Sequence, residues 1–205
     1  MKSSVKFIYY FFAFLWLVSL LACPFFTFFP SAISCELPWF NISNVIVDQK
    51  GNTYIGLPFY GRVQSYDKEG NFRKQWHIGH GNGGSFRLIL SPNQYIEVAT
   101  AQGRSLNTFD SKGKLIKVKH NTDLFHRLYD KRTHPFVDRN KNEYGIKDKF
   151  LIPKIFRESP SGKEELVVIM PWYLFFVDPS YTFCFLVVSG LMQWVNNKKK
   201  EKEVI

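Results

Sequence analysis

Residues 45–76 read VIVDQKGNTYIGLPFYGRVQSYDKEGNFRKQW, and this stretch decides how the rest of the chain is interpreted. The turn residues Asp, Asn and Gly recur in it at short intervals, where positive φ and Asx hydrogen bonding are needed. Between them, aliphatic and aromatic residues form four short runs: Val45–Val47, Thr53–Gly56, Arg62–Tyr66 and Asn71–Trp76. The stretch therefore predicts a four-stranded antiparallel meander.

The same pattern recurs twice further along the chain. The second copy runs from Phe86 to Val118, and the third, degraded copy starts at Phe136. We match Tyr54 with Tyr95 and Tyr144, Gly61-Arg62 with Gly103-Arg104, Tyr66-Asp67 with Phe109-Asp110, Val47-Asp48 with Val137-Asp138, and Gly70 with Gly113 and Gly162. A period of about 40–45 residues with four strands per unit is typical of β-propeller blades. We therefore predict an all-β fold of about three propeller-like blades within residues 36–170.

The repeat also resembles a known family. The motifs GNTYIG at 51–56 and GRVQSYDKEGNF at 61–72, with the Gly-rich lead-in GHGNGGSF at 79–86, resemble the NHL-type β-propeller repeat. The resemblance implies blades that radiate round an axis, usually about six to a ring. It also implies a binding platform for proteins, glycans or RNA, with a minority of enzymes. Three recognisable copies fall short of a ring, so we expect a protein partner, self-association, or atypical strands from the residues around 120 and the C-terminal block to complete it.

The N-terminal block, residues 1–35, is predicted to be a membrane anchor or signal segment. Residues 7–29 carry no charge and follow Lys2 and Lys6, and they are long enough to span a bilayer core of about 30 Å. Three alternatives are open: an uncleaved anchor, which the length favours; a lipoprotein signal ending in LLAC at 20–23; and a cleaved signal with Ala32-Ile33-Ser34 as its small-residue site. All three take the middle of the chain out of the cytoplasm.

The C-terminal block contains a second apolar stretch, PWYLFFVDPSYTFCFLVVSGLMQWV at 171–195. We interpret 171–197 as a transmembrane helix and 198–205 as a short basic cytoplasmic tail, because Lys198–Lys200 follow the apolar run directly. Asp178 and Pro179 interrupt the run, so the alternative keeps Tyr173–Val177 as a last strand of the third blade. Lysines at both ends predict that both termini are cytoplasmic and that the repeat domain is extracytoplasmic.

The charge and cysteine content narrow the partner classes. The net charge is +10, but Lys and Arg are scattered and form no stripe, so nucleic acid is an unlikely partner and the lipid bilayer an expected one. Cys23 and Cys184 lie in the apolar ends, which leaves Cys35 alone in the middle without an internal disulfide framework. Residues 119–135 break the strand pattern and are predicted as an insertion, with a short helix over Leu124–Tyr129.

Candidate binding residues are Arg62, Arg104, His77 and His80. The two arginines occupy matching positions of the first two copies, which predicts a cationic rim facing an anionic ligand; the alternative is packing of their aliphatic stems. His77 precedes the Gly-rich loop, and His80 lies within it. The histidines lack an HExxH-type spacing, so we predict no metal site, no cofactor and no catalytic residue.

The sequence as a whole favours a membrane-anchored, non-catalytic binding or interaction protein. One alternative is a propeller-type enzyme, such as a metal-assisted lyase or lactonase. Another is an accessory subunit of a membrane complex whose helices make the main contacts.

Overall fold

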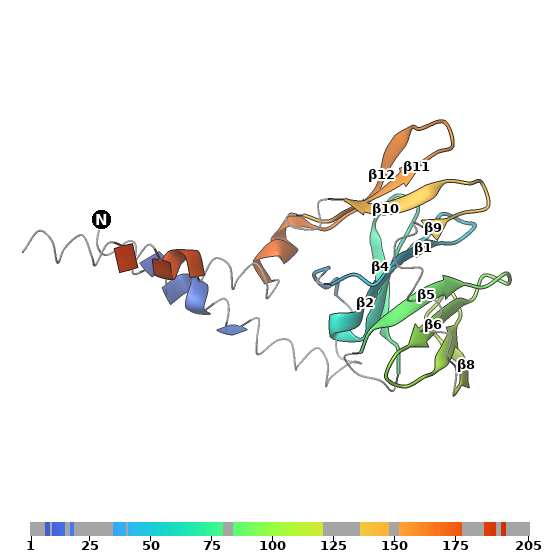
Figure 1. Ribbon diagram of the computed structural model, residues 1–205, viewed down its shortest axis with the longest axis horizontal. Helices are drawn as coiled ribbons and strands as arrows, with labels where there is room; N and C mark the ends of the chain where they lie inside the picture. Colours follow the sequence, from blue (N-terminus) through green and yellow to red (C-terminus); the bar gives the residue numbers. More distant parts are fainter. Residues whose placement is uncertain are drawn as a thin grey trace, which may run out of the picture. The chain divides into compact units, whose positions relative to one another are not determined.

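The computed structural model describes residues 7, 8, 10–14, 17, 18, 35–39, 41–79, 84–120, 136–147, 152–177, 187–191, 194 and 195 (Figure 1). Its contacts divide the chain into two units. Thr27–Met170 forms the unit that contains the β-strands, called the β-unit below. Met1–Phe26 and Pro171–Ile205 form the other unit. The predicted helix at 124–129 lies outside the described residues.

The described residues of the β-unit form three four-stranded antiparallel sheets, each with its strands in chain order (Figure 1). This confirms the prediction of an all-β, blade-like meander in three copies, and each sheet is called a blade below. The strands of the first blade are β1 (Val45–Val47), β2 (Thr53–Leu57), β3 (Arg62–Tyr66) and β4 (Phe72–His77); those of the second are β5 (Phe86–Leu90), β6 (Ile96–Thr100), β7 (Leu106–Phe109) and β8 (Leu115–Lys119); those of the third are β9 (Phe136–Val137), β10 (Glu143–Lys147), β11 (Lys154–Glu158) and β12 (Glu164–Ile169).

The two outer hairpin turns of each blade share one geometry. In the β1–β2 turn, the amide of Asp48 donates to the carbonyl of Asn52 and the amide of Gly51 donates to the carbonyl of Asp48, both at 3.0 Å. The corresponding bonds recur in the β3–β4 turn and in both such turns of the other blades. This is the three-residue hairpin loop in which a type I turn is followed by a left-handed residue. That residue is Gly51, Gly70, Gly113 or Gly162 in four turns, and Gln94 or Lys141 in the others.

The strand register corrects two of the sequence matches, and the first is the match of Tyr54 with Tyr95. Val47 pairs with Thr53 in the first blade, and Leu90 pairs with Ile96 in the second. Tyr54 therefore corresponds to Glu97, not to Tyr95, whereas its match with Tyr144 holds in the third blade. The sequence alignment followed aromatic identity and was wrong by two residues. The exposures agree with the register, since Tyr54 is 2% exposed and Tyr95 is 39% exposed.

The first blade lies between the other two, so the order in space is third, first, second. Strand β1 contacts β5 of the second blade and also β9 and β10 of the third. Phe136 of the third blade packs against the core that joins the first and second blades. That core consists of Ile46, Tyr54, Val63, Trp76, Ile78, Phe86, Leu88, Ile96, Val98 and Phe109.

One kind of contact repeats between neighbouring blades. A Cβ added to Gly113, in the β7–β8 turn, would lie 2.6 Å from the ring of Trp76 on β4. A Cβ added to Gly70, in the β3–β4 turn, would lie 2.5 Å from the carbonyl oxygen of Val167 on β12. Gly162, at the same position of the third blade, has nothing within 4 Å. The β7–β8 turn of the second blade thus packs on β4 of the first blade, and the β3–β4 turn of the first blade packs on β12 of the third. Among the described residues, the β11–β12 turn of the third blade makes no such contact.

The segment at residues 36–39, before β1, packs against the first blade. Leu37 and Trp39 are buried, and Trp39 Nε1 donates to the hydroxyl of Tyr66 at 2.7 Å. The Tyr66 hydroxyl in turn donates to Glu36 Oε1 at 2.7 Å. Burial raises the pKa of Glu36, and the Tyr66 bond opposes that shift. The amide of Trp39 donates to Met170 Sδ at 3.3 Å, so the segment before β1 contacts the residue that follows β12.

The second unit is described only in part. The described residues among 7–18 and 187–195 are helical, and Trp172–Val177 forms the 3-10 helix η3. The alternative of a last strand at Tyr173–Val177 is therefore wrong: the amide of Leu174 donates to the carbonyl of Pro171 at 3.0 Å, which closes a helical turn. Among the described residues, no helix is both long and apolar enough to cross a membrane. Much of both predicted spans lies outside the described residues.

Candidate functional site

The structure brings two of the predicted site residues together. Arg62 begins β3 and pairs in register with His77 on β4, next to the β2–β3 connection. Arg62 is 1% exposed, and burial lowers the pKa of its guanidinium, with an opposing effect from Cys35. His77 is half-buried, and its Nδ1 accepts a hydrogen bond from the amide of Gly79 at 3.1 Å. His80 lies outside the described residues.

Arg104 does not match Arg62. Thr53 pairs with Tyr66, and Ile96 pairs with Phe109, so Arg62 corresponds to Ser105. Arg104 instead takes the place of Gly61, and both adopt a positive φ, 41° and 61°. The predicted equivalence is wrong by one residue, a shift that reverses the direction of a side chain in a strand. Arg62 is buried and Arg104 is exposed, so the two do not form a matching cationic rim.

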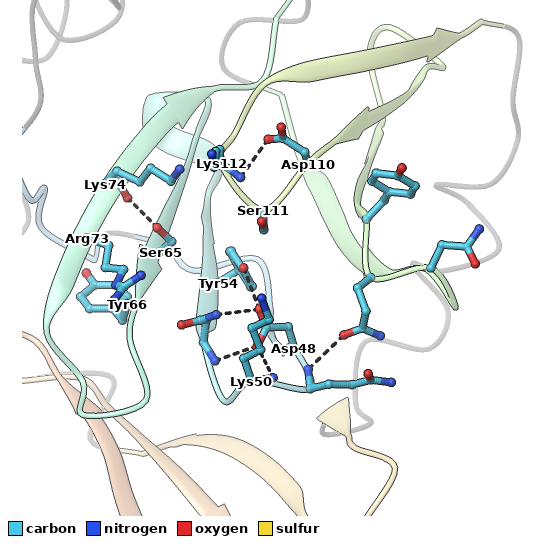
Figure 2. Close-up of a pocket in the computed structure, with 15 residues that line it drawn as sticks. Asp48, Lys50, Tyr54, Ser65, Tyr66, Arg73, Lys74, Asp110, Ser111 and Lys112 are labelled. Atoms are coloured by element: carbon cyan, nitrogen blue, oxygen red, sulfur yellow. Dashed lines mark hydrogen bonds between the residues drawn. The ribbon is translucent and has the colours of Figure 1, made fainter.

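Two clefts lie at the end of the blades opposite Arg62 and His77. The β1–β2 and β3–β4 turns of the first blade and the equivalent turns of the other two blades lie at this end. The first–second cleft, between those two blades, has a volume of about 450 Å³ (Figure 2). The first–third cleft has a volume of about 810 Å³. Asp48, Gln49 and Lys50 line both clefts.

An aspartate holds the β1–β2 turn in place. Asp48 Oδ1 accepts hydrogen bonds from the amides of Lys50 at 2.8 Å and Asn52 at 2.9 Å. Its Oδ2 accepts from the Asn52 side chain at 2.8 Å and from the Tyr54 hydroxyl at 3.0 Å. Burial and the charge of Asp48 together raise the pKa of Tyr54. Both carboxylate oxygens are therefore committed to the turn.

The third blade repeats this arrangement around Asp138. The amides of Asn140 and Asn142 donate to its Oδ1, and the Asn142 side chain and the Tyr144 hydroxyl donate to its Oδ2. In the second blade Ser91 replaces the aspartate, and its Oγ accepts from the amide of Tyr95 at 3.0 Å. The spacing D-x-x-x-N-x-Y at 48–54 and 138–144 is the sequence signal that identifies these turns.

The Asp138 turn predicts a pH dependence of stability. Burial alone would raise the pKa of Asp138, but the bonds from Asn142, Asn140 and Tyr144 outweigh it and hold the pKa below its usual value. A lowered folded pKa stabilises the fold above the unfolded pKa of about 3.9, and this contribution disappears as pH falls through the folded value. We expect Asp138→Asn to flatten the decline of the melting temperature between about pH 5 and pH 2. An unchanged pH profile would contradict this role.

Cations outnumber carboxylates in the first–second cleft. It is lined by Lys50, Arg73, Lys74 and Lys112, against Asp48 and Asp110. Within the described chain, the ammonium groups of Lys50, Lys74 and Lys112 form no ion pair, and Arg73 lies 3.9 Å from Asp67 Oδ2. The pKa of Lys74 is lowered by burial first and then by Lys112 and Arg73, with Asp110 opposing. The cleft is therefore electropositive.

The first–third cleft has the same charge balance. Lys50, Lys68, Arg139 and Arg157 line it, against Asp48 and Asp138. Arg157 also forms an ion pair with Glu165, and Lys68 lies 3.5 Å from Glu69. The backbone amide of Gln49 donates to Gln94 Oε1 at 3.0 Å, which links the β1–β2 turn of the first blade to the β5–β6 turn of the second beside both clefts.

The clefts were not among the sites predicted from the sequence. Their cations come from separate turns and strands, so no local cluster marks them along the chain. Among the described residues, no group of three or more His, Cys, Asp or Glu side chains is placed to hold a metal ion.

No family model and no curated relative matches the chain. Among solved structures, it is similar to a selenomethionine-substituted virginiamycin B lyase from Staphylococcus aureus, with 11% identity and a TM-score of 0.33 over 61% of this chain and 40% of that one. It is also similar to a streptogramin B lyase, with 12% identity and a TM-score of 0.36 over 65% and 42% of the two chains. The chain thus spans about two fifths of these enzymes, and such weak similarity carries no argument about activity. What identifies the β-unit is its own architecture: an all-β protein of three four-stranded, propeller-like blades.

Proposed function

We propose that the chain is a membrane-anchored, non-catalytic binding protein that presents its blades outside the cytoplasm to another component of the envelope or membrane. The observation that carries the proposal is the state of Asp48 and Asp138, two of the three carboxylates that line the clefts. Both oxygens of Asp48 and of Asp138 accept turn hydrogen bonds, so neither group is available as a general base. The clefts present donors and cations instead, which suits recognition better than acid–base chemistry.

The two apolar ends support the membrane part of the proposal. Residues 7–29 and 171–195 flank the β-unit, and lysines lie beyond both stretches. Two spans in one membrane, with both termini cytoplasmic, fit these features and the positive-inside rule.

The uncovered faces of the outer blades support association with a second copy. The uncovered face of the second blade carries two rows of residues paired across its strands. One row is Glu97, Thr108 and Lys117, and the next is Leu106 and Lys119. The uncovered face of the third blade is the opposite face of its sheet, and it carries Glu143, Glu158 and Glu164 in one row, Phe156 and Leu166 in the next, and Lys147 and Lys154 in a third.

These two faces are complementary. The second blade has more lysine than glutamate on its face, the third has more glutamate than lysine, and both have apolar residues between the charges. Head-to-tail packing of two copies would continue the turn-on-strand contact that already joins the blades, and two such contacts would close a ring.

Mass measurement of the intact protein tests this proposal. We expect it to remain in membranes through salt and alkali washes, and to have twice the mass of one chain after detergent extraction. Leu166→Lys, on the uncovered face of the third blade, should give single chains. Leu115→Lys, an equally exposed leucine on the opposite face of the second blade, should leave the mass unchanged. Release by salt, or a single-chain mass for the unmodified protein, would overturn the membrane or the association part respectively.

A further inference from the structure

We infer that the first–second and first–third clefts together form a binding site for a ligand with more than one phosphate-type oxyanion group. The inference rests on the proposed binding function and names the chemistry of its ligand. Asp48, Gln49 and Lys50 of the β1–β2 turn stand between the two clefts and line both. A ligand with two anionic groups can therefore engage both clefts across this turn.

Charge is the first observation behind the inference. Each cleft has four cationic side chains against two carboxylates. The Asp48 and Asp138 oxygens accept hydrogen bonds from turn amides and from tyrosine hydroxyls, and Asp110 Oδ1 accepts from the amides of Lys112 and Lys114. These carboxylates stabilise the turns, while the ammonium groups of Lys50, Lys74 and Lys112 form no ion pair in the described chain. An anion in the cleft would provide the missing counter-charge.

The position of Lys74 is the second observation. This side chain is half-buried between the first two blades, in a cleft it shares with Lys112 and Arg73. Figure 2 shows Lys74 reaching the cleft from β4, Lys112 and Ser111 from the β7–β8 turn, and Lys50 from the β1–β2 turn. Like charges brought together in a partly dry cleft repel one another unless an anion lies between them.

The donor types favour an oxyanion over a simple halide. Ser111, Asn93 and Tyr95 line the first–second cleft beside the lysines. A phosphate group has several acceptor oxygens, and ammonium, hydroxyl and amide donors together can satisfy them. Both cleft volumes fall in the range of about 300–1,000 Å³ that is usual for small-molecule sites. Such groups are present both in soluble polyphosphates and in lipid headgroups.

The experiment uses the intact protein in neutral detergent, titrated with inorganic tripolyphosphate and with inorganic phosphate, and followed by calorimetry. We expect tripolyphosphate to bind at least about tenfold more tightly than phosphate, a difference of about 1.4 kcal/mol. A second arm measures binding to vesicles of anionic phospholipid and of neutral phospholipid. Tripolyphosphate binding assigns the site to soluble polyanions; vesicle binding that tripolyphosphate does not displace assigns it to lipid headgroups.

A matched pair of triple variants separates the site from general basicity. Lys50→Gln with Lys74→Gln and Lys112→Gln removes three charges from the cleft and should weaken binding at least about tenfold. Lys114→Gln with Lys141→Gln and Lys163→Gln removes three exposed hairpin-turn charges that line neither cleft, and should change binding less than about twofold. Melting curves verify that both variants fold. If the cleft triple does not fold, two single variants take the place of the triples: Lys112→Gln in the cleft and Lys114→Gln outside it. Lys112→Gln should weaken binding more than Lys114→Gln.

Equal weakening in the two triples, or no binding in either arm, would overturn the inference. The mass of the complex is measured on the same detergent preparation. The proposed membrane function and the proposed ligand class can therefore be overturned independently. A membrane-derived dimer that binds no phosphate probe overturns the ligand class alone. A protein that binds the probe but is released from membranes by salt overturns the membrane function alone.

Discussion

Replacing Trp76 with alanine is expected to lower the free energy of unfolding of the β-unit by about 3–5 kcal/mol. Trp76 belongs to β4 of the first blade and is 8% exposed. Its ring centroid lies 6.1 Å from that of Tyr54 and 6.2 Å from that of Phe109 on the second blade. The β7–β8 turn covers the same ring at Gly113. Alanine would leave a cavity at the point where two blades meet.

Denaturant unfolding of the detergent-extracted protein, followed by far-ultraviolet circular dichroism, measures this effect. Trp76→Phe should fall between the parent and Trp76→Ala, because the smaller ring keeps part of the stacking. Trp172→Ala is the matched control, since Trp172 lies outside the β-unit and is 67% exposed. A loss below about 1 kcal/mol for Trp76→Ala would show that the blades do not depend on this contact.

Gly113→Ala is the second substitution with a large expected effect. Gly113 has φ +75, where alanine costs roughly 1–2 kcal/mol, and its Cβ would lie 2.6 Å from the Trp76 ring. Overpacking against a fixed ring adds about 1–3 kcal/mol. Gly162→Ala is a close control, because Gly162 has φ +78 in the same turn type and nothing within 4 Å. We expect the first cost alone at Gly162 and both costs at Gly113.

The difference between these two alanine variants isolates the contact between blades. The backbone cost is common to both positions and cancels, so the remainder belongs to the turn-on-strand packing. Gly70→Ala should resemble Gly113→Ala, since a Cβ there would meet the Val167 carbonyl oxygen at 2.5 Å. Equal losses at Gly113 and Gly162 would show that the turn moves away from Trp76 at no cost.

The blades could be predicted because their signals are local. Asp and Gly occupy the fixed places in both turns of the first blade and in the β7–β8 turn, and apolar runs lie between the turns. The register within the second copy was harder, because Tyr95 offers an aromatic match two residues away from the position that Tyr54 occupies. The match of the two tyrosines therefore gave the wrong register. Aligning Gln94 with Gly51, which takes the same place in the turn, gives the correct one.

The arrangement of the blades and the clefts depends on contacts between distant residues. Nothing local indicates that the third blade packs beside the first, since this follows from contacts such as that of Phe136 with the core around Ile46. Lys50, Lys74 and Lys112 are far apart in the chain, and their scattering argued against a basic patch. They meet because each occupies a turn, or the strand beside one, at the same end of neighbouring blades.

The contact between Trp39 and Met170 has a mechanical consequence. A force that pulls Trp39 and Met170 apart loads this contact directly. Met170→Ala would remove the sulfur atom that accepts the Trp39 amide, so the same pull would act directly on β12, which ends at Ile169.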